Sequence, residues 1–94
     1  MHITFVIKRK ADGSTCGKCE DVQRRLERDG HLRHIDTVAV ADVTDPDSPG
    51  MVLATTLGVE NAPFFVVRDG EQTTVYTIYL KFVREVLQAR LAAG

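Results

Sequence analysis

Apolar positions along the chain follow two different periods, which predict strands and helices in turn. Short runs rich in β-branched and aromatic residues predict four strands, at 3–8, 35–41, 64–67 and 73–78. Apolar residues three or four positions apart predict helices at 17–29 and 49–57. A further helix carries an apolar stripe of Leu80, Val83, Leu87 and Leu91. The predicted element order is therefore β-α-β-α-β-β-α.

Residues that commonly start or end helices stand at the predicted boundaries. Gly30 and Gly58 follow the first two predicted helices, where glycine often ends a helix. Ser48 is a candidate N-cap of the second helix, with Pro49 at the first helical position. The dipeptide Asp69-Gly70 is a strong signal for a tight hairpin between the last two strands.

This order of elements predicts an α/β fold. The first strand, the first helix and the second strand form a right-handed parallel crossover, whereas a two-residue hairpin makes the last two strands antiparallel. One four-stranded mixed sheet flanked by helices buries all of the apolar faces. A chain of 94 residues has the length of one domain, which we expect to span residues 1–94.

Composition and charge argue against several classes of protein. The hydrophobic share of 44% and the charged share of 27% are usual for a folded globular protein. The 12 basic and 13 acidic residues give a formal net charge of −1, so we expect no nucleic acid partner. No apolar run approaches the roughly 20 residues that span a bilayer, and the first residues lack the pattern of a signal peptide. We therefore expect a cytoplasmic protein with no membrane partner.

The candidate chemistry centres on the two cysteines, Cys16 and Cys19. Because a reducing cytoplasm disfavours a permanent disulfide, a Cys-x-x-Cys pair indicates redox chemistry or metal binding. The pair stands where a loop becomes the first predicted helix, whose free N–H groups and dipole stabilise a thiolate. We expect Cys16, at the mouth of the helix, to be the attacking thiol. Cys19, one turn further in, would resolve the mixed disulfide.

Residues near the cysteines in the predicted fold suggest how a substrate approaches. Gly17 leaves the approach path free of a side chain, and Lys18 either adds a positive charge or is simply solvated. Pro63 opens the third predicted strand, a position that tolerates the missing N–H. Together with Ala62 it either forms a cis peptide bond at a functional site or only marks the end of a loop.

These features together resemble the thioredoxin/glutaredoxin superfamily over essentially the whole chain. The matching motifs are Cys16-Gly17-Lys18-Cys19 at a helix start, Ala62-Pro63 before a strand, and the Asp69-Gly70 hairpin. The resemblance implies a minimal thioredoxin fold. Its size is glutaredoxin-like, since the extra N-terminal strand and helix of thioredoxin are missing. The resemblance also implies that the Ala62–Pro63 bond is cis, lies beside the cysteines and pairs with an extended segment of the substrate.

Some motifs of that superfamily are replaced in this chain. There is no Trp, and Thr15 stands where thioredoxin has a Trp before its first cysteine. The loop before Cys16 is longer than usual. Tyr76-Thr77-Ile78-Tyr79 replaces the Gly-Gly-x-Asp of glutaredoxins, so the resemblance does not extend to that glutathione-binding segment.

The resemblance implies a thiol–disulfide oxidoreductase that exchanges electrons with a protein partner through Cys16 and Cys19. An upstream reductase or thiol donor would restore the dithiol, and we expect a monomer that needs no cofactor. The alternative is a thioredoxin-fold binding module, or an electron carrier dedicated to one partner enzyme. Its docking face could use four aromatic residues that otherwise belong to the core: Phe64, Phe65, Tyr76 and Tyr79.

A zinc site is a further alternative, with four candidate ligands: Cys16, Cys19, His31 and His34. Their spacing is close to that of a zinc finger. The predicted helix at 17–29 would, however, separate the cysteines from the histidines by about 18 Å, whereas zinc ligands lie about 2.0–2.3 Å from the metal. We therefore expect no metal and place both histidines in a surface loop.

Overall fold

The structure of the protein, a computed structural model, describes residues 1–88. Its elements follow the predicted order, with one short 3₁₀ helix, η1, added after the first helix. The strands are β1 (His2–Arg9), β2 (Thr37–Asp42), β3 (Phe64–Asp69) and β4 (Gln72–Tyr76). The helices are α1 (Gly17–Arg28), η1 (Leu32–His34), α2 (Pro49–Leu57), α3 (Tyr79–Phe82) and its π-helical continuation η2 (Val83–Leu87).

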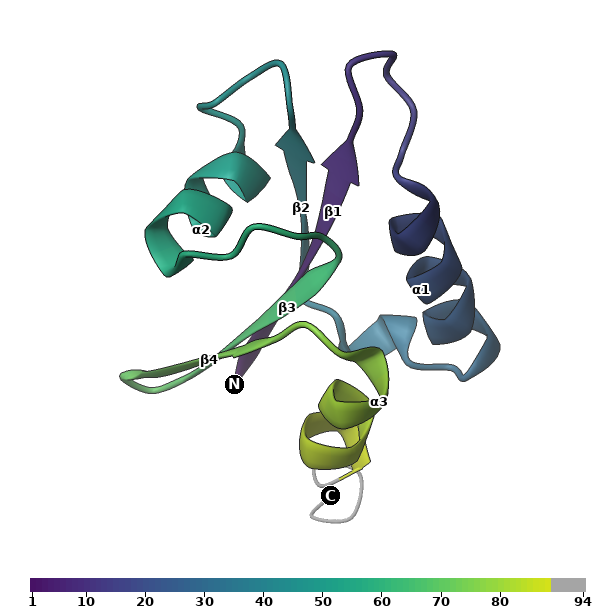
Figure 1. Cartoon of the computed structure of the whole chain (residues 1–94). Coiled ribbons are helices and arrows are strands. Elements are labelled where there is room, and N and C mark those ends of the chain that lie inside the picture. Colours follow the sequence, from purple (N-terminus) through teal and green to yellow (C-terminus); the bar gives the residue numbers. More distant parts are fainter. Residues whose placement is uncertain (89–94) are drawn as a thin grey trace.

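The four strands form one mixed sheet in the order β2-β1-β3-β4 (Figure 1). β1 pairs with β2 in parallel and with β3 antiparallel, and β3 pairs antiparallel with β4. The predicted α/β class and mixed four-stranded sheet are therefore confirmed. No helix within residues 1–88 is long and apolar enough to span a membrane.

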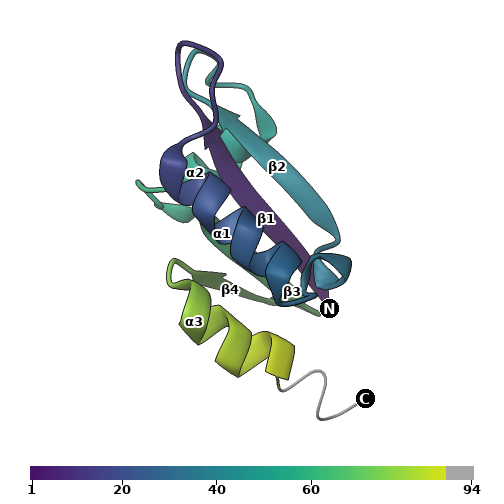
Figure 2. The same ribbon diagram turned by 90° about the vertical axis from the view of Figure 1, so that its right-hand side faces the viewer.

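Helices cover both faces of this sheet and bury a core on each side. α1 and α3 lie on one face and α2 lies on the other (Figures 1 and 2). Because side chains alternate along a strand, Phe5 belongs to the first core and Val6 to the second. In the first core the Phe65 ring stacks on Phe82, with their centroids 3.9 Å apart. This stacking packs α3 against the centre of the sheet.

Several predicted boundaries shift because tertiary contacts compete with the local pattern. β2 begins at Thr37, two residues later than predicted, and Asp36 before it contacts β1 partly through its side chain. Its N–H donates to the carbonyl of Ile3 at 2.9 Å, and its carboxylate accepts from the Ile3 N–H at 2.7 Å. At the hairpin, Asp69 still pairs with Gln72, so the two-residue turn lies one position later than predicted. Gly70 opens that turn with a φ of +63°, which glycine adopts without strain.

The predicted apolar stripe of the last helix was wrong at Leu80, whose exposed fraction is 62%. The buried face instead contains Tyr79, Phe82, Val86 and Leu87. The π-helical segment from Val83 to Leu87 holds more residues per turn than an α-helix, which rotates the side chains relative to a 3.6-residue stripe. Leu91 lies outside the described residues.

Ser48 occupies the N-cap position of α2, as predicted, but its hydroxyl does not cap the helix. It accepts a hydrogen bond from the Asp42 N–H at 3.0 Å and donates one to the carbonyl of Asp45 at 2.8 Å. Ser48 therefore joins the end of β2 to the loop that leads into α2.

Candidate redox site at the start of helix α1

Cys16 is brought to the start of α1 by a small hairpin that continues β1. The N–H of Lys10 donates to the Ser14 carbonyl at 2.7 Å, Arg9 forms a bridge with Thr15, and the N–H of Cys16 donates to the Lys8 carbonyl at 2.9 Å. The chain thus reverses direction after β1, and the segment before Cys16 pairs antiparallel with the end of β1. Figure 1 shows this loop beyond the end of β1, directly before α1.

Cys16 is the N-cap residue of α1, which agrees with its predicted position at the start of the helix. Its sulfur accepts a hydrogen bond from the N–H of Cys19 at 3.3 Å, and its side chain is half-buried. Both cysteines are free thiols. Gly17 and Lys18, between them, are exposed, and the space beside the Gly17 Cα is open. The thiol of Cys16 is therefore the more accessible of the two, and it is the acceptor for the Cys19 N–H in the first turn of the helix.

Cys19 differs sharply from Cys16, because its exposed fraction is 0%. Its sulfur accepts a hydrogen bond from the backbone N–H of Lys8 at 3.3 Å. Burial, and then the hydrogen bond with Cys16, raise the pKa of Cys19 to about 12, although the Lys8 N–H acts in the opposite direction. Cys19 is therefore a protonated, shielded thiol in the reduced protein.

Lys8 also connects the cysteines to the Ala62–Pro63 segment. β1 and β3 pair with Val6 opposite Phe64, and continuing this antiparallel register by two residues places Ala62 beside Lys8. Lys8 and Ala62 also line the same cavity. The peptide bond between Ala62 and Pro63 is cis, as predicted. Figures 1 and 2 show the loop before β3 at the same end of the sheet as the start of α1.

The cavity beside Lys8 has a volume of about 170 Å³ and a mostly apolar lining. It lies between the end of the sheet and α2, and its apolar lining includes Val43, Met51, Ala54, Val59, Ala62 and Phe64. Glu60 and Asn61 lie at its polar edge. A cavity of this kind suits one aliphatic side chain better than a charged group.

Lys8 was not predicted as a site residue from the sequence, although its backbone contacts both cysteines. The peptide group of Lys8 contacts both Cys16 and Cys19. The available signal was its place near the end of the strand that precedes the Cys-x-x-Cys loop.

Within residues 1–88 the structure brings together neither the four alternative zinc ligands nor the four residues of the alternative aromatic docking face. His31 lies just beyond the last turn of α1 and Cys16 just before the first, so the twelve-residue helix separates them by about 18 Å. Within residues 1–88 no cluster of three or more His, Cys, Asp or Glu side chains could hold a metal ion. His31 and His34 flank or belong to η1 and are partly buried, so the predicted surface loop was only partly right. The proposed aromatic docking face is not formed, since Phe64, Phe65 and Tyr79 are buried.

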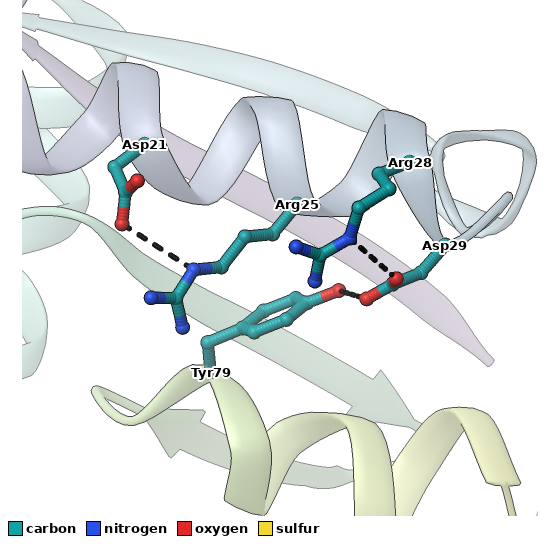
Figure 3. A network of polar contacts seen from close by, with 5 residues as sticks. All are labelled: Asp21, Arg25, Arg28, Asp29 and Tyr79. Atoms are coloured by element: carbon teal, nitrogen blue, oxygen red, sulfur yellow. Dashed lines mark hydrogen bonds and ion pairs between the residues drawn. The ribbon is translucent and has the colours of Figure 1, made fainter.

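The opposite end of α1 is held by a polar network shown in Figure 3. Asp29 is the C-cap of α1, and its carboxylate accepts a hydrogen bond from the Tyr79 hydroxyl at 3.0 Å. The same carboxylate forms an ion pair with Arg28 at 3.1 Å. One turn earlier, Arg25 pairs with Asp21 at 3.4 Å. Tyr79 is the first residue of α3, so this network links the two helices that share one face of the sheet.

Comparisons with known proteins support the fold and leave the activity open. No protein-family model matches the sequence, and no curated protein matches it. The structure is similar to the solution structure of a thioredoxin from Thermus thermophilus, with a TM-score of 0.53 and 21% sequence identity. The similarity covers 99% of this chain and 77% of that one. The protein therefore has a thioredoxin-like fold.

Proposed function

We propose that this protein is a thiol–disulfide oxidoreductase that exchanges electrons with a protein partner through Cys16 and Cys19. The observation that carries the proposal is the inequality of the two thiols at one helix start. Cys16 is partly exposed and accepts a hydrogen bond from the Cys19 N–H, whereas Cys19 is fully buried. A partly exposed thiol beside a fully shielded one is the arrangement that two successive exchange steps need.

In the first step the Cys16 thiolate attacks one sulfur of the partner's disulfide. A new bond joins Cys16 to that sulfur, the partner's S–S bond breaks, and the second partner sulfur leaves as a thiolate that takes up a proton. In the second step Cys19 loses its proton and attacks the sulfur of Cys16. The mixed disulfide breaks and the second partner thiol is released. Two electrons pass to the partner, and a disulfide between Cys16 and Cys19 remains.

The position of Ala62 supports an extended polypeptide as the substrate. Within residues 1–88, the backbone N–H and carbonyl of Ala62 make no hydrogen bond, although the register places this residue beside Lys8. An incoming strand could pair with both groups. Pro63, which has no N–H, ends the stretch available for pairing. Ala62 and Pro63 are thus the proposed substrate-binding residues, together with the exposed Gly17 and Lys18.

The wider cellular setting is also part of this proposal. An upstream reductase or thiol donor returns the disulfide to the dithiol, and the chain works as a monomer without a cofactor. A cytoplasmic location suits a pair of free cysteines that must be reduced in each cycle. The near balance of 12 basic and 13 acidic residues supports a protein partner over a nucleic acid.

Trapping the mixed disulfide tests the proposal directly. The variant Cys19→Ser, incubated reduced with insulin, should accumulate a covalent complex with an insulin chain, because the resolving thiol is missing. Cys16→Ser is the matched control and should form no complex, since Cys19 is buried. Mass spectrometry and non-reducing electrophoresis detect the complex and its loss on adding dithiothreitol.

The wild-type protein provides the second half of this experiment. Its oxidised form should carry an intramolecular disulfide, so alkylation in guanidinium chloride after dithiothreitol adds two groups that are absent without dithiothreitol. A trapped complex in Cys16→Ser instead of Cys19→Ser would reverse the assigned roles. Two free thiols after treatment with diamide, a strong thiol oxidant, would refute the redox function itself.

A further inference from the structure

A second hollow in the surface lies on the α2 face of the sheet, away from the cysteines. The cavity beside Lys8 is lined by residues near the C-terminal ends of β1 and β2, whereas this hollow is lined by residues near their N-terminal ends. α2 lies between the two, since Met51 lines the first and Val52 lines the second. Figure 1 shows the N-terminus of the chain at the end of β1 opposite the loop that leads into α1. The hollow is therefore separate from the candidate redox site.

The lining of the hollow has an apolar side and a polar side. Its volume of about 410 Å³ lies in the range that is usual for small-molecule sites. The apolar side comes from α2 and the middle of the sheet: Pro49, Val52, Leu53, Ala39 and Val66. The polar side comes from the strands: His2, Thr4, Thr37 and Arg68. A ligand that fills the hollow therefore needs an apolar part and a polar part.

Strand pairing brings the polar side chains together. His2 lies opposite Arg68 in the antiparallel pair of β1 and β3, and Thr4 is the partner of Thr37 in the parallel pair of β1 and β2. His2 and Thr4 share a face of β1, because side chains two positions apart point the same way. The Thr37 hydroxyl lies 3.1 Å from the His2 Nε2. Three neighbouring strands thus supply four hydrogen-bonding side chains to one side of the hollow.

Thr4 is buried in the wall of this hollow without a hydrogen-bond partner. Its exposed fraction is 8%, yet within residues 1–88 its hydroxyl forms no hydrogen bond. Buried hydroxyl groups in folded proteins are nearly always hydrogen-bonded. Because Thr4 lines the hollow, a ligand there can supply an oxygen atom that accepts from this hydroxyl.

The charge around the hollow favours an anion. Among residues 1–88, Arg68 forms no ion pair, and no residue that lines the hollow is acidic. Asp36, directly before β2, accepts a hydrogen bond from the Ile3 N–H at 2.7 Å, and Asp69 points to the opposite face of β3 from Arg68. A guanidinium group binds a carboxylate through two parallel hydrogen bonds. A carboxylate therefore suits the polar side better than a neutral group.

We propose that this hollow is a binding site for a small carboxylate with an aliphatic chain. The carboxylate lies among Arg68, His2 and Thr4, and the aliphatic chain packs along Val52 and Leu53. The site contains neither cysteine, so this inference does not depend on the redox function proposed above.

NMR titration of the isotope-labelled, reduced, full-length protein with three probes tests the inference. Hexanoate carries both the carboxylate and the chain, acetate lacks the chain, and hexan-1-ol lacks the charge. Hexanoate should bind with a Kd of about 1 mM and shift the amide signals of Thr4, Val52 and Val66. Acetate should bind about tenfold more weakly, because even partial burial of the additional CH₂ groups contributes that much. Hexan-1-ol should also bind about tenfold more weakly, since it makes no charge-assisted hydrogen bond.

Substitutions in the polar side show whether these residues hold the carboxylate. Arg68→Gln should weaken hexanoate binding about tenfold and leave hexan-1-ol binding unchanged. Arg24→Gln is the matched control, because Arg24 is exposed on α1, which covers the other face of the sheet. Thr4→Val should weaken hexanoate binding several-fold without lowering the Tm, since the free protein loses no hydrogen bond. Thermal unfolding of each variant confirms that it folds.

The possible results decide the inference without involving the cysteines. Shifts at the hollow, together with weaker binding in Arg68→Gln but not in Arg24→Gln, support it. It is overturned by equal affinities for hexanoate and hexan-1-ol, by unchanged hexanoate binding in Arg68→Gln, by shifts at Ala54 and Ala62 in place of the hollow, or by no binding. All of these outcomes leave the redox proposal standing, because the hollow and the cysteines lie at opposite ends of β1.

Discussion

The hydroxyl of Tyr79 donates a hydrogen bond of 3.0 Å to the carboxylate of Asp29, a residue 50 positions earlier in the chain. Asp29 caps the C-terminus of α1 and Tyr79 begins α3. The bond therefore fixes the end of the helix that carries the cysteines at its start (Figure 3).

Replacing Tyr79 by Phe should destabilise the protein slightly without changing the core. The ring stays buried against Phe65, and only the bond to Asp29 is lost. We expect the Tm to fall by about 1–4 °C, because a hydrogen bond whose acceptor lies at the surface contributes less than a buried one. Arg84→Ala, an exposed change on the following helical segment, is the control. A Tm for Tyr79→Phe equal to that of wild type would contradict a stabilising role.

The same tyrosine should make the free energy of unfolding depend on pH in the alkaline range. Burial and the bond to Asp29 raise the pKa of Tyr79 to about 12, whereas an unfolded tyrosine has a pKa of about 10. The unfolded chain therefore loses this proton first, and the free energy of unfolding falls as pH rises from about 10 to about 12. Urea unfolding of wild type and Tyr79→Phe between pH 9 and 12 measures the difference. Two parallel curves would show that Tyr79 is not the group involved.

The two cysteines should differ strongly in alkylation. Iodoacetamide reacts with accessible thiolates, and Cys19 is buried with a pKa raised to about 12. At pH 8 the reduced protein should gain one group, at Cys16, and a second only in guanidinium chloride. Peptide mapping by mass spectrometry identifies the modified residue. Equal rates at both cysteines in the folded protein would contradict the described burial of Cys19.

A methyl group added at Gly50 should destabilise the protein. Gly50 is in the first turn of α2, and a Cβ there would overlap the backbone of Val40 and Ala41 in β2. Gly50→Ala should therefore lower the free energy of unfolding by about 1–3 kcal/mol, the usual cost of overpacking, despite the better helix propensity of Ala. Thr56→Ala, exposed on the same helix, is the control and should stay within about 0.5 kcal/mol. A gain in stability for Gly50→Ala would show that α2 can move away from β2.

Ser48→Ala should also destabilise the protein. The interaction lost is the hydrogen bond to the end of β2, because the Ser48 hydroxyl does not cap α2. The variant leaves the partly buried N–H of Asp42 without its 3.0 Å acceptor, which should cost about 1 kcal/mol, the low end of the cost of a buried unsatisfied donor. The control Ser14→Ala removes a hydroxyl whose bond to Asp12 is exposed, so its effect should be much smaller. Urea unfolding compares the two variants. Equal effects would mean that the Ser48 hydroxyl does not stabilise this connection.

Features that depend on neighbouring residues in the chain could be predicted from the sequence. The alternation that sends Phe5 and Val6 to opposite faces of β1 is a property of any strand. The place of Cys16 and Cys19 at a helix start follows from the loop before them and the helical period after them. The order of elements, and with it the mixed sheet, follows from these local signals.

Contacts between distant segments were decided only by the tertiary structure. The bond from the Lys8 N–H to Cys19, and the placement of Ala62 beside Lys8, depend on which residues of β1 face the loop and which residues of β3 face β1. A shift of one residue in either register would turn different groups toward the thiols. Backbone groups carry no residue-specific signal, so the sequence could not indicate that Lys8 acts through its peptide group.

The last helix shows the same division. Its period predicted an apolar stripe that includes Leu80, yet packing against the sheet selects Tyr79 and Phe82 and leaves Leu80 in solvent. The sequence determined that a helix forms there, because periodicity is local. Which face it buries was decided by the stacking of Phe82 on Phe65 and by the bond from Tyr79 to Asp29, since these contacts exist only once the sheet and α1 are in place.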